Sequence, residues 1–202
     1  SNIYRLMQQL EMTDYQQLYD WSISEPEGFW GQMVGLLNIH FHRPYRQVLD
    51  LKDGVAHPNW MIGSQLNIVD SCFQADSQAI AIVYQNPSGQ IEKCTYGQLE
   101  KLVNRIGNAL VGMGVRPDSH VGIDMTMTVE AVAIYLACIK TGAVVVTVAD
   151  SFAPPEIAVR LQIAEVSLVF TQDLIHRTGK QLPLYQKVVE AGAEKVVVIP
   201  TV

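Results

Sequence analysis

The alternation of apolar and polar positions is clearest over residues 95–150, which read as helix, strand, helix, strand. Thr95 and Gln98 form a Thr-x-x-Gln capping box at the start of the first helix. Gly112 and Gly114 suit the left-handed turn that ends one. Between them, six apolar side chains fall on one helical face: Leu99, Leu102, Val103, Ile106, Leu110 and Met113. The pattern therefore predicts an amphipathic helix.

The second half of this stretch is more apolar. Residues 120–125 are short and apolar, as a buried strand is. The helix expected over 129–140 has an almost unbroken apolar run and should be buried nearly all round. Residues 143–149 are rich in β-branched side chains and predict a second buried strand. Two such strands joined by a helix form a right-handed βαβ unit.

The rest of the C-terminal half continues the alternation. Strands at 79–84 and 91–94 predict a hairpin before the first helix. A helix opening at Pro154, a strand at 168–171, a helix within 183–192 and a strand at 195–199 follow the βαβ unit. Strands alternating with helices predict an α/β fold with a doubly wound, mostly parallel sheet.

The first sixty residues have a different pattern and predict a helical N-terminal extension. Ser24 and Glu27 have the spacing of a second capping box, with Pro26 tolerated in the first turn. Residues 38–59 contain two prolines and a glycine and show no period. They are therefore predicted to be a loop.

Amino-acid composition, charge and cysteine spacing argue against several classes of protein. Apolar residues make up 49% and charged residues 17% of the 202 positions, which is typical of a globular chain. A net charge of −6 without any basic run argues against nucleic-acid binding. Cys72, Cys94 and Cys138 lie far apart, which favours reduced thiols in a cytoplasmic protein without a metal site. Residues 131–149 are apolar, but Lys140, Thr141 and Gly142 interrupt them, which argues against a membrane span.

Four segments stand in a recognisable order: residues 25–30, 60–73, 95–99 and 139–143. They resemble the opening helix, the Trp- and Leu-Asn-containing segment and the first two core motifs of the adenylate-forming acyl-CoA synthetases, the acetyl-CoA synthetase branch in particular. The resemblance covers nearly all of residues 14–202. It implies a helical N-terminal extension over residues 1–73. Residues 74–202 would then be the first α/β part of a truncated AMP-binding domain, so the chain is expected to be an N-terminal fragment.

The resemblance also implies an acid–thiol ligase. Such an enzyme uses ATP and Mg²⁺ to convert a carboxylic acid into an acyl-adenylate, and coenzyme A then accepts the acyl group. The family's catalytic motifs come later in its chains, so no catalytic or metal-binding residue is assigned here. We expect this chain to need the remainder of its parent to be active. The alternative is a self-contained, non-catalytic α/β module that binds a nucleotide or a protein.

The best candidate for chemistry is the segment Ile175–Lys180. Arg177 and Lys180 flank a small pair, Thr178 and Gly179, whose backbone N–H groups suit a phosphate oxygen. A solvated basic turn is the plain alternative. In acetyl-CoA synthetases the matching segment is Arg-Ala-Gly-Arg, which holds phosphates at the adenosine end of coenzyme A. The resemblance therefore implies that Arg177 and Lys180 bind phosphate and that Thr178 and Gly179 shape the loop, with Lys180 replacing the family's second arginine.

A second candidate, Asp150-Ser151-Phe152, follows a predicted parallel strand. Open α/β sheets bind ligands at this end of their strands. The family has Gly-Phe-Ser here, beside the coenzyme A nucleotide, and Ser151 stands at the glycine position. The resemblance implies a coenzyme A contact for Ser151. For Asp150, capping of the turn is an equally good interpretation.

Overall fold

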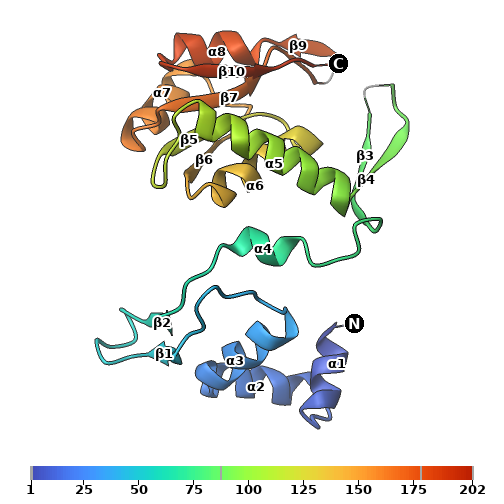
Figure 1. The fold of residues 1–202 in the computed structure, drawn as a ribbon, viewed down its shortest axis with the longest axis vertical. Helices are drawn as coiled ribbons and strands as arrows, with labels where there is room; N and C mark the ends of the chain where they lie inside the picture. Colours follow the sequence, from blue (N-terminus) through green and yellow to red (C-terminus); the bar gives the residue numbers. More distant parts are fainter. Residues whose placement is uncertain (1, 87, 178, 202) are drawn as a thin grey trace. The chain divides into compact units, whose positions relative to one another are not determined.

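The computed structural model describes residues 2–86, 88–177 and 179–201 (Figure 1). The chain divides into two compact units, residues 1–67 and residues 68–202. The predicted candidate residues all belong to the second unit.

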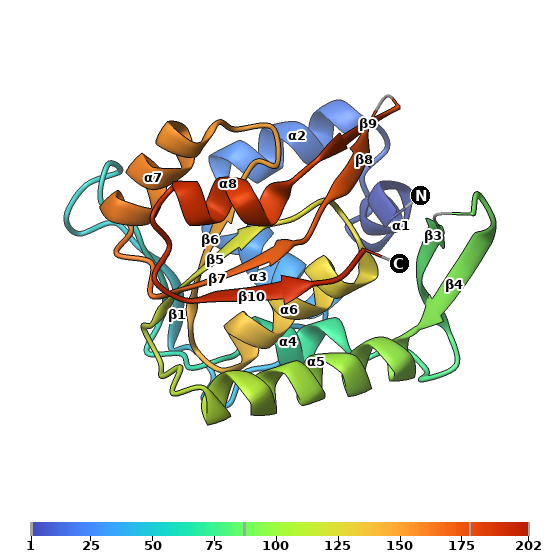
Figure 2. The same cartoon turned by 90° about the horizontal axis from the view of Figure 1, so that it is seen from above.

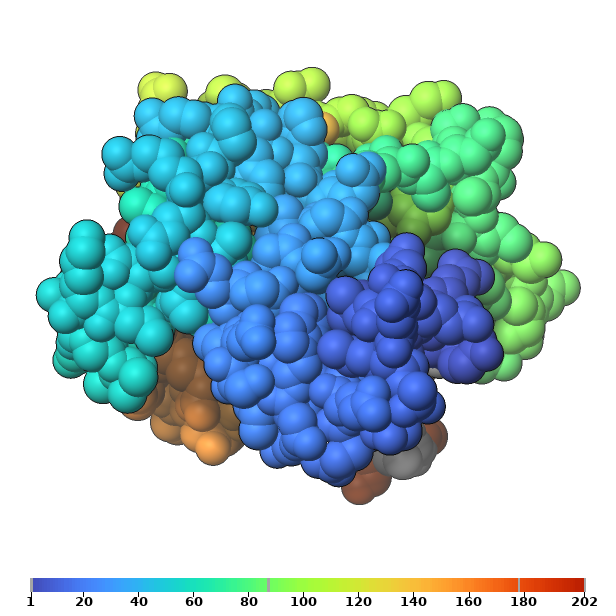
Figure 3. Space-filling view, turned by 90° about the horizontal axis from the view of Figure 1, so that it is seen from below, coloured from blue at the N-terminus to red at the C-terminus, as the bar shows by residue number. Residues whose placement is uncertain are grey.

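The first unit begins with three helices, in keeping with the helical extension that the sequence predicts: α1 (Asn2–Gln9), α2 (Tyr15–Ser24) and α3 (Pro26–Leu36). In the space-filling view the atoms of α1 lie against those of the helices that follow it (Figure 3). Four aromatic rings pack edge to face in series, with centroids 5.4–6.0 Å apart: Trp21, Phe29, Trp30 and Trp60. Edge-to-face contact of this kind is a favoured arrangement of aromatic rings.

Two predictions for the first unit are wrong. The expected loop over 38–59 contains β1 (Gln47–Asp50), which pairs antiparallel with β2 (Asn59–Ile62), with Leu49 opposite Trp60. The expected capping box is also absent, because α2 continues through Ser24, whose hydroxyl donates to the Trp21 carbonyl at 3.4 Å. Helix α3 starts at Pro26 with no side-chain cap.

The centre of the second unit is a four-stranded parallel sheet with strand order β10-β7-β5-β6. Its strands are β5 (His120–Asp124), β6 (Val144–Val148), β7 (Leu168–Gln172) and β10 (Val196–Ile199). The prediction of an α/β fold with a parallel sheet is confirmed. Because all four strands run the same way, the residues that follow them gather at one edge, which we call the carboxyl edge.

Helices cover both faces of this sheet (Figure 2). On one face lie α5 (Tyr96–Gly112) and α6 (Val129–Lys140), which pack on Val121, Ile123 and Phe170. On the other lie α7 (Pro154–Ile163) and α8 (Leu184–Glu190), which pack on Val148 and Val169. Side chains alternate between faces along a strand. Asp124 therefore points to the same face as Gly122, toward α7 and α8.

Local chemistry explains the boundaries of these elements. The predicted capping box is present: Gln98 N–H donates to the Thr95 hydroxyl at 3.2 Å, and Thr95 N–H donates to the Gln98 side chain at 2.8 Å. The box satisfies two backbone N–H groups at the start of α5. At the start of α6 the Thr128 hydroxyl accepts the Ala131 N–H at 3.1 Å.

Smaller elements complete the unit. Helix α4 (Ile68–Cys72) precedes a hairpin of β3 (Ile80–Gln85) and β4 (Ile91–Thr95), close to the predicted strands. A second hairpin, β8 (Ile175–Arg177) with β9 (Lys180–Leu182), lies between β7 and α8. Across the described part of the chain, no helix has the length and apolar character needed to cross a membrane.

Candidate functional site

The β8–β9 hairpin brings two predicted phosphate ligands together. Arg177 and Lys180 are direct cross-strand partners. Directly opposite side chains share one face of a hairpin, with Cβ atoms about 4.5–5.5 Å apart, and like charges there repel. Gly179 has φ +76°, which favours glycine, and an added Cβ would meet no heavy atom within 4 Å. Thr178, the fourth predicted residue of this segment, lies outside the described residues.

Arg177 also reaches the second predicted segment, 27 residues earlier in the chain. Its Nη1 atom donates to Asp150 Oδ1 at 3.2 Å. The arginine side chain stays 55% exposed and that of Asp150 is 21% exposed. A guanidinium presents five N–H donors in a planar fork, and one of them is used in this pair. The structure therefore places the basic hairpin beside the turn that contains Ser151, and Asp150 is an ion-pair partner of the hairpin.

A third cation, Lys187, reaches the same turn. Its Nζ atom donates to the main-chain carbonyl oxygen of Asp150 at 2.9 Å. Lys187 comes from α8 and is half-buried. Asp150 is thus held from two sides, by Arg177 on its carboxylate and by Lys187 on its backbone. Sequence reasoning missed Lys187, because a lysine in a short helix has no local feature that connects it to a turn 37 residues away.

A buried carboxyl group, that of Asp124, lies at the end of β5. The residue is 0% exposed, and among the described residues neither carboxyl oxygen has a hydrogen-bond partner. Burial raises the pKa of Asp124 to about 6; the positive charge of Lys187 lowers it and the negative charge of Asp150 raises it. Sequence reasoning treated residues 120–125 as an apolar strand. The acidic residue near its end was the available signal.

Other polar groups at the carboxyl edge satisfy one another. The Thr126 hydroxyl donates to Gln172 Oε1 at 2.7 Å. Asp173 Oδ1 accepts the backbone N–H groups of Leu174 and Thr201, each at 2.8 Å. The Thr201 bond first, and then the Leu174 bond, lowers the pKa of Asp173. Asp124 differs from these neighbours, because no described residue is hydrogen-bonded to its carboxyl group.

The topology marks the same region. Strands β5 and β7 are neighbours, but the chain leaves β5 for α6 on one face and leaves β7, after the β8–β9 hairpin, for α8 on the other. Open α/β sheets bind ligands outside the carboxyl ends of strands where connections diverge in this way. Asp124 and Gln172 end the two strands at this point.

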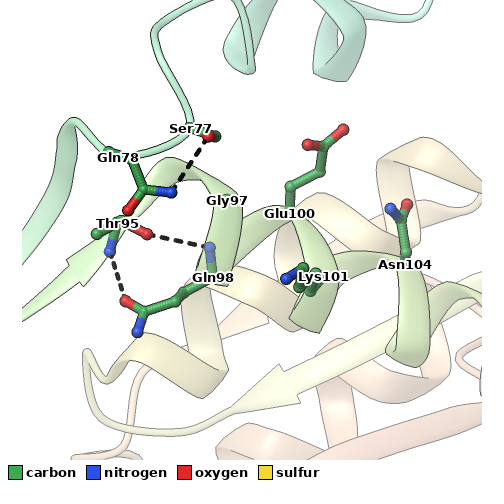
Figure 4. A pocket seen from close by; sticks show the side chains of 8 residues that line it. All are labelled: Ser77, Gln78, Thr95, Gly97, Gln98, Glu100, Lys101 and Asn104. Carbon is green, nitrogen blue, oxygen red and sulfur yellow. Dashed lines mark hydrogen bonds between the residues drawn. The ribbon is translucent and has the colours of Figure 1, made fainter.

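A separate hollow of about 300 Å³ lies at the start of α5 (Figure 4). Its lining residues are Ser77, Gln78, Thr95, Gly97, Gln98, Glu100, Lys101 and Asn104. In the capping box the Thr95 hydroxyl and the Gln98 side-chain oxygen already accept backbone N–H groups. None of the described residues among the predicted ligands, Ser151, Arg177, Gly179 and Lys180, lines this hollow. We therefore place the candidate site at the carboxyl edge, where the charged groups converge.

No group of three or more histidine, cysteine, aspartate or glutamate side chains that could hold a metal ion occurs within residues 2–86, 88–177 and 179–201.

Two family profiles match the chain in sequence order. One, described as acetyl-coenzyme A synthetase N-terminus, matches residues 15–72. The other, described as AMP-binding enzyme, matches residues 70–202. Together they account for nearly the whole chain.

Curated relatives agree with these profiles. The chain is 38% identical to "probable acyl-activating enzyme 18, peroxisomal" of Arabidopsis thaliana, over 89% of this chain and 25% of that protein. It is 34% identical to hexanoyl-CoA synthase of Cannabis sativa, over 94% of this chain and 28% of that protein. It is also 34% identical to acetyl-coenzyme A synthetase of Magnetococcus marinus, over 89% of this chain and 29% of that protein.

The fold has a solved counterpart. An acetoacetyl-CoA synthetase from Streptomyces lividans superposes with a TM-score of 0.91 at 24% identity, covering 100% of this chain and 33% of that one. The chain therefore spans between a quarter and a third of the length of the proteins it matches.

Proposed function

The chain belongs to the AMP-binding enzyme family, and on that premise we propose that it is the N-terminal part of an ATP-dependent acyl-CoA synthetase of the acetyl-CoA synthetase type. The observation that carries this proposal is the order of the two profile matches along one chain. The parent enzyme would activate a carboxylic acid as an acyl-adenylate, with ATP and Mg²⁺, and transfer the acyl group to coenzyme A. Its compartment would be the cytoplasm.

The same premise supports a division of the chain into two parts. Residues 1–73 would be the helical extension typical of acetyl-CoA synthetases, and residues 74–202 the first α/β part of the large AMP-binding domain. No residue of this chain is proposed to be catalytic. ATP, Mg²⁺ and the acid substrate would meet residues that the remainder of the parent supplies.

For coenzyme A we propose a site on the carboxyl edge made by Arg177, Thr178, Gly179, Lys180 and Ser151. The cross-strand pair of Arg177 and Lys180 supports it. A phosphate anion between these two cations would attract both and offset their mutual repulsion. The contact of Arg177 with Asp150 also supports it, since this contact brings Ser151 beside the hairpin. The arginine would bind phosphate through its planar fork and the lysine as a mobile point charge.

The coenzyme A site can be tested with a probe that contains only the relevant end of the cofactor. Adenosine 3′,5′-bisphosphate should bind the purified 202-residue chain in isothermal titration calorimetry. Arg177→Met and Lys180→Met should each weaken binding by about 1–2 kcal/mol, roughly 5- to 30-fold, because each removes one charge-assisted contact.

Two controls make this test specific. Lys195→Met removes a cation just before β10, at the opposite edge of the sheet, and should leave binding unchanged. Adenosine, which lacks phosphate, should bind far more weakly than the bisphosphate. Equal losses in Arg177→Met and Lys195→Met would show a general charge effect and contradict the proposed site.

A further inference from the structure

The buried carboxyl of Asp124 is the feature that the proposed coenzyme A site does not use. Removing a carboxylate from water without giving it a hydrogen-bond donor raises the free energy of the folded state. Buried carboxylates are therefore normally paired with a cation or hydrogen-bonded. Asp124 is fully buried with neither oxygen bonded to a described group, while Gln172 and Asp173 at the same edge accept hydrogen bonds. Its charge must therefore be balanced by a nearby cation or removed by a proton.

Lys187 is the cation in position to provide that balance. Its charge acts on Asp124, and its Nζ atom is fixed 2.9 Å from the Asp150 carbonyl oxygen. An ammonium has three donors on a flexible four-carbon stem. It can therefore donate to the carbonyl oxygen while its positive charge attracts the carboxylate.

The other charged or titratable side chains on the elements around β5 contact other groups or are exposed to solvent. From α7, the Arg160 guanidinium lies 3.9 Å from the centroid of the Phe152 ring and donates to the Glu156 carbonyl. From α6, Glu130 acts on Tyr84 and Cys94 on the opposite face. Glu190 of α8 accepts from Gln186. Beyond β7, Asp173 is bonded to backbone N–H groups, and on β8 His176 is exposed.

We propose that Asp124 is a positioning residue whose buried carboxylate holds Lys187 on the Asp150 carbonyl and thereby fixes the Asp150–Ser151 turn. The arrangement has three parts. The carboxylate of β5 attracts the ammonium of α8, the ammonium donates to the backbone just before Ser151, and Arg177 holds the Asp150 carboxylate from the other side. Strand end, helix and hairpin are thus joined through one residue, Asp150.

Two consequences distinguish this role from simple packing. Protonation of Asp124 removes the attraction on Lys187, so the Asp150–Ser151 turn should respond to the ionisation of Asp124 by way of Lys187. An arginine at position 187 keeps the charge and should preserve the response, whereas an uncharged methionine should abolish it. That this turn binds coenzyme A rests on the proposed function; that Asp124 fixes it does not.

The test is an NMR titration of the ligand-free 202-residue chain between pH 4.5 and 8. The amide signals of Asp150 and Ser151 and the side-chain carboxyl carbon of Asp124 would be followed together. The titrations use a His176→Gln background, so that the imidazole on β8 contributes nothing. We expect the Ser151 amide to shift with the same midpoint, near pH 6, as the Asp124 carboxyl carbon.

Variants decide the cause of that shift. Asp124→Asn and Lys187→Met should remove the inflection near pH 6 from the Ser151 amide, while Lys187→Arg and the matched control Lys195→Met should retain it. A Ser151 amide that does not follow the Asp124 carbon in the unsubstituted chain overturns the proposal. So does an inflection that survives Lys187→Met. The first of these outcomes needs no substitution at positions 124 or 187, so a misfolded variant cannot mask it.

Binding of adenosine 3′,5′-bisphosphate at pH 7.5 separates this proposal from the coenzyme A site. If both hold, Lys187→Met should weaken binding by 3- to 10-fold and Lys187→Arg should restore it. If the Ser151 amide follows Asp124 but the unsubstituted chain does not bind the bisphosphate, the positioning role stands and the coenzyme A site fails. If the unsubstituted chain binds the bisphosphate but its Ser151 amide does not shift with the Asp124 carboxyl carbon, the coenzyme A site stands and the positioning role fails.

Discussion

At the scale of single residues, the carboxyl edge contrasts two kinds of aspartate. Asp173 receives backbone N–H groups that favour its charged form and lower its pKa. Asp124 receives none from the residues that the structure describes, and burial raises its pKa to about 6. A few ångströms of backbone geometry therefore decide whether a carboxylate at the end of a parallel strand adds to or subtracts from stability at neutral pH.

This contrast gives a prediction for the free energy of unfolding. The raised pKa of Asp124 favours folding while the carboxyl is neutral, and this contribution is lost as pH rises from about 4 through the folded pKa of about 6. Two pKa units correspond to about 3 kcal/mol. Asp124→Asn should therefore be the more stable protein at pH 7, and its advantage over the unsubstituted chain should shrink by about 3 kcal/mol on acidification to pH 4. Urea unfolding across this range measures the difference.

Asp173→Asn is the matched control, because its sign is opposite. A lowered pKa contributes stability that is present at neutral pH and is lost as pH falls through the folded pKa. Asp173→Asn should therefore be destabilising at pH 7 and less so in acid. If the two variants respond to pH with the same sign, the assignment of a raised pKa to Asp124 is wrong.

At the scale of elements, the sheet depends on close approach at Gly122. A Cβ added there would lie 3.2 Å from side-chain carbons of both Val166 and Val169, and 3.5 Å from Leu161. Strand β5 carries Asp124 two residues later on the same face. The glycine thus sets how closely α7 approaches the strand that ends in the site.

Gly122→Ala should accordingly lower the free energy of unfolding by about 1–3 kcal/mol, since the extra methyl overpacks the core. Gly112→Ala offers a comparison, because that glycine ends α5 with no heavy atom within 4 Å of an added Cβ. It should leave the urea midpoint unchanged or raise it slightly. A neutral Gly122→Ala would mean that the helix is free to move away from the sheet.

The elements that the sequence predicts well are those with a local signal. Residues 95–150 show the 3.6-residue period, glycine stops and β-branched runs, and the structure has α5, β5, α6 and β6 there. The Thr95–Gln98 box is also local and is present. Ser24 and Glu27 have the same spacing but lie where one helix continues into the next, so the spacing alone is insufficient.

Elements without a local signal escaped prediction. Strands β1, β2, β8 and β9 have three or four residues, too few for a period of two to be recognised. The predicted Arg177 and Lys180 face each other because of the β8–β9 pairing. The contacts of Asp150 with Arg177 and Lys187 join residues 27 and 37 positions apart. Only the tertiary fold of the parallel sheet brings such groups to one edge.

At the scale of the whole molecule, the two units differ in the core that each can build. Four buried apolar side chains lie in the first unit: Leu6, Leu18, Val48 and Leu49. The second unit contains a main cluster between the sheet and α5–α6 and another beneath α7–α8. Hydrophobic burial is the dominant favourable term in folding. The second unit therefore has the greater capacity to fold by itself.

This difference gives a prediction for the domain boundary proposed at residue 73. Expressed separately, residues 74–202 should unfold in one cooperative transition, whereas residues 1–73 should unfold at lower temperature or remain unfolded, because small cores seldom outweigh conformational entropy. Circular dichroism on heating, recorded for both pieces and for the full chain, would show this. A second piece, residues 68–202, tests the boundary itself by restoring α4, which packs on α6. Equal melting of the two longer pieces would support the boundary at 73, and a markedly higher melting temperature for residues 68–202 would move it to the junction after residue 67.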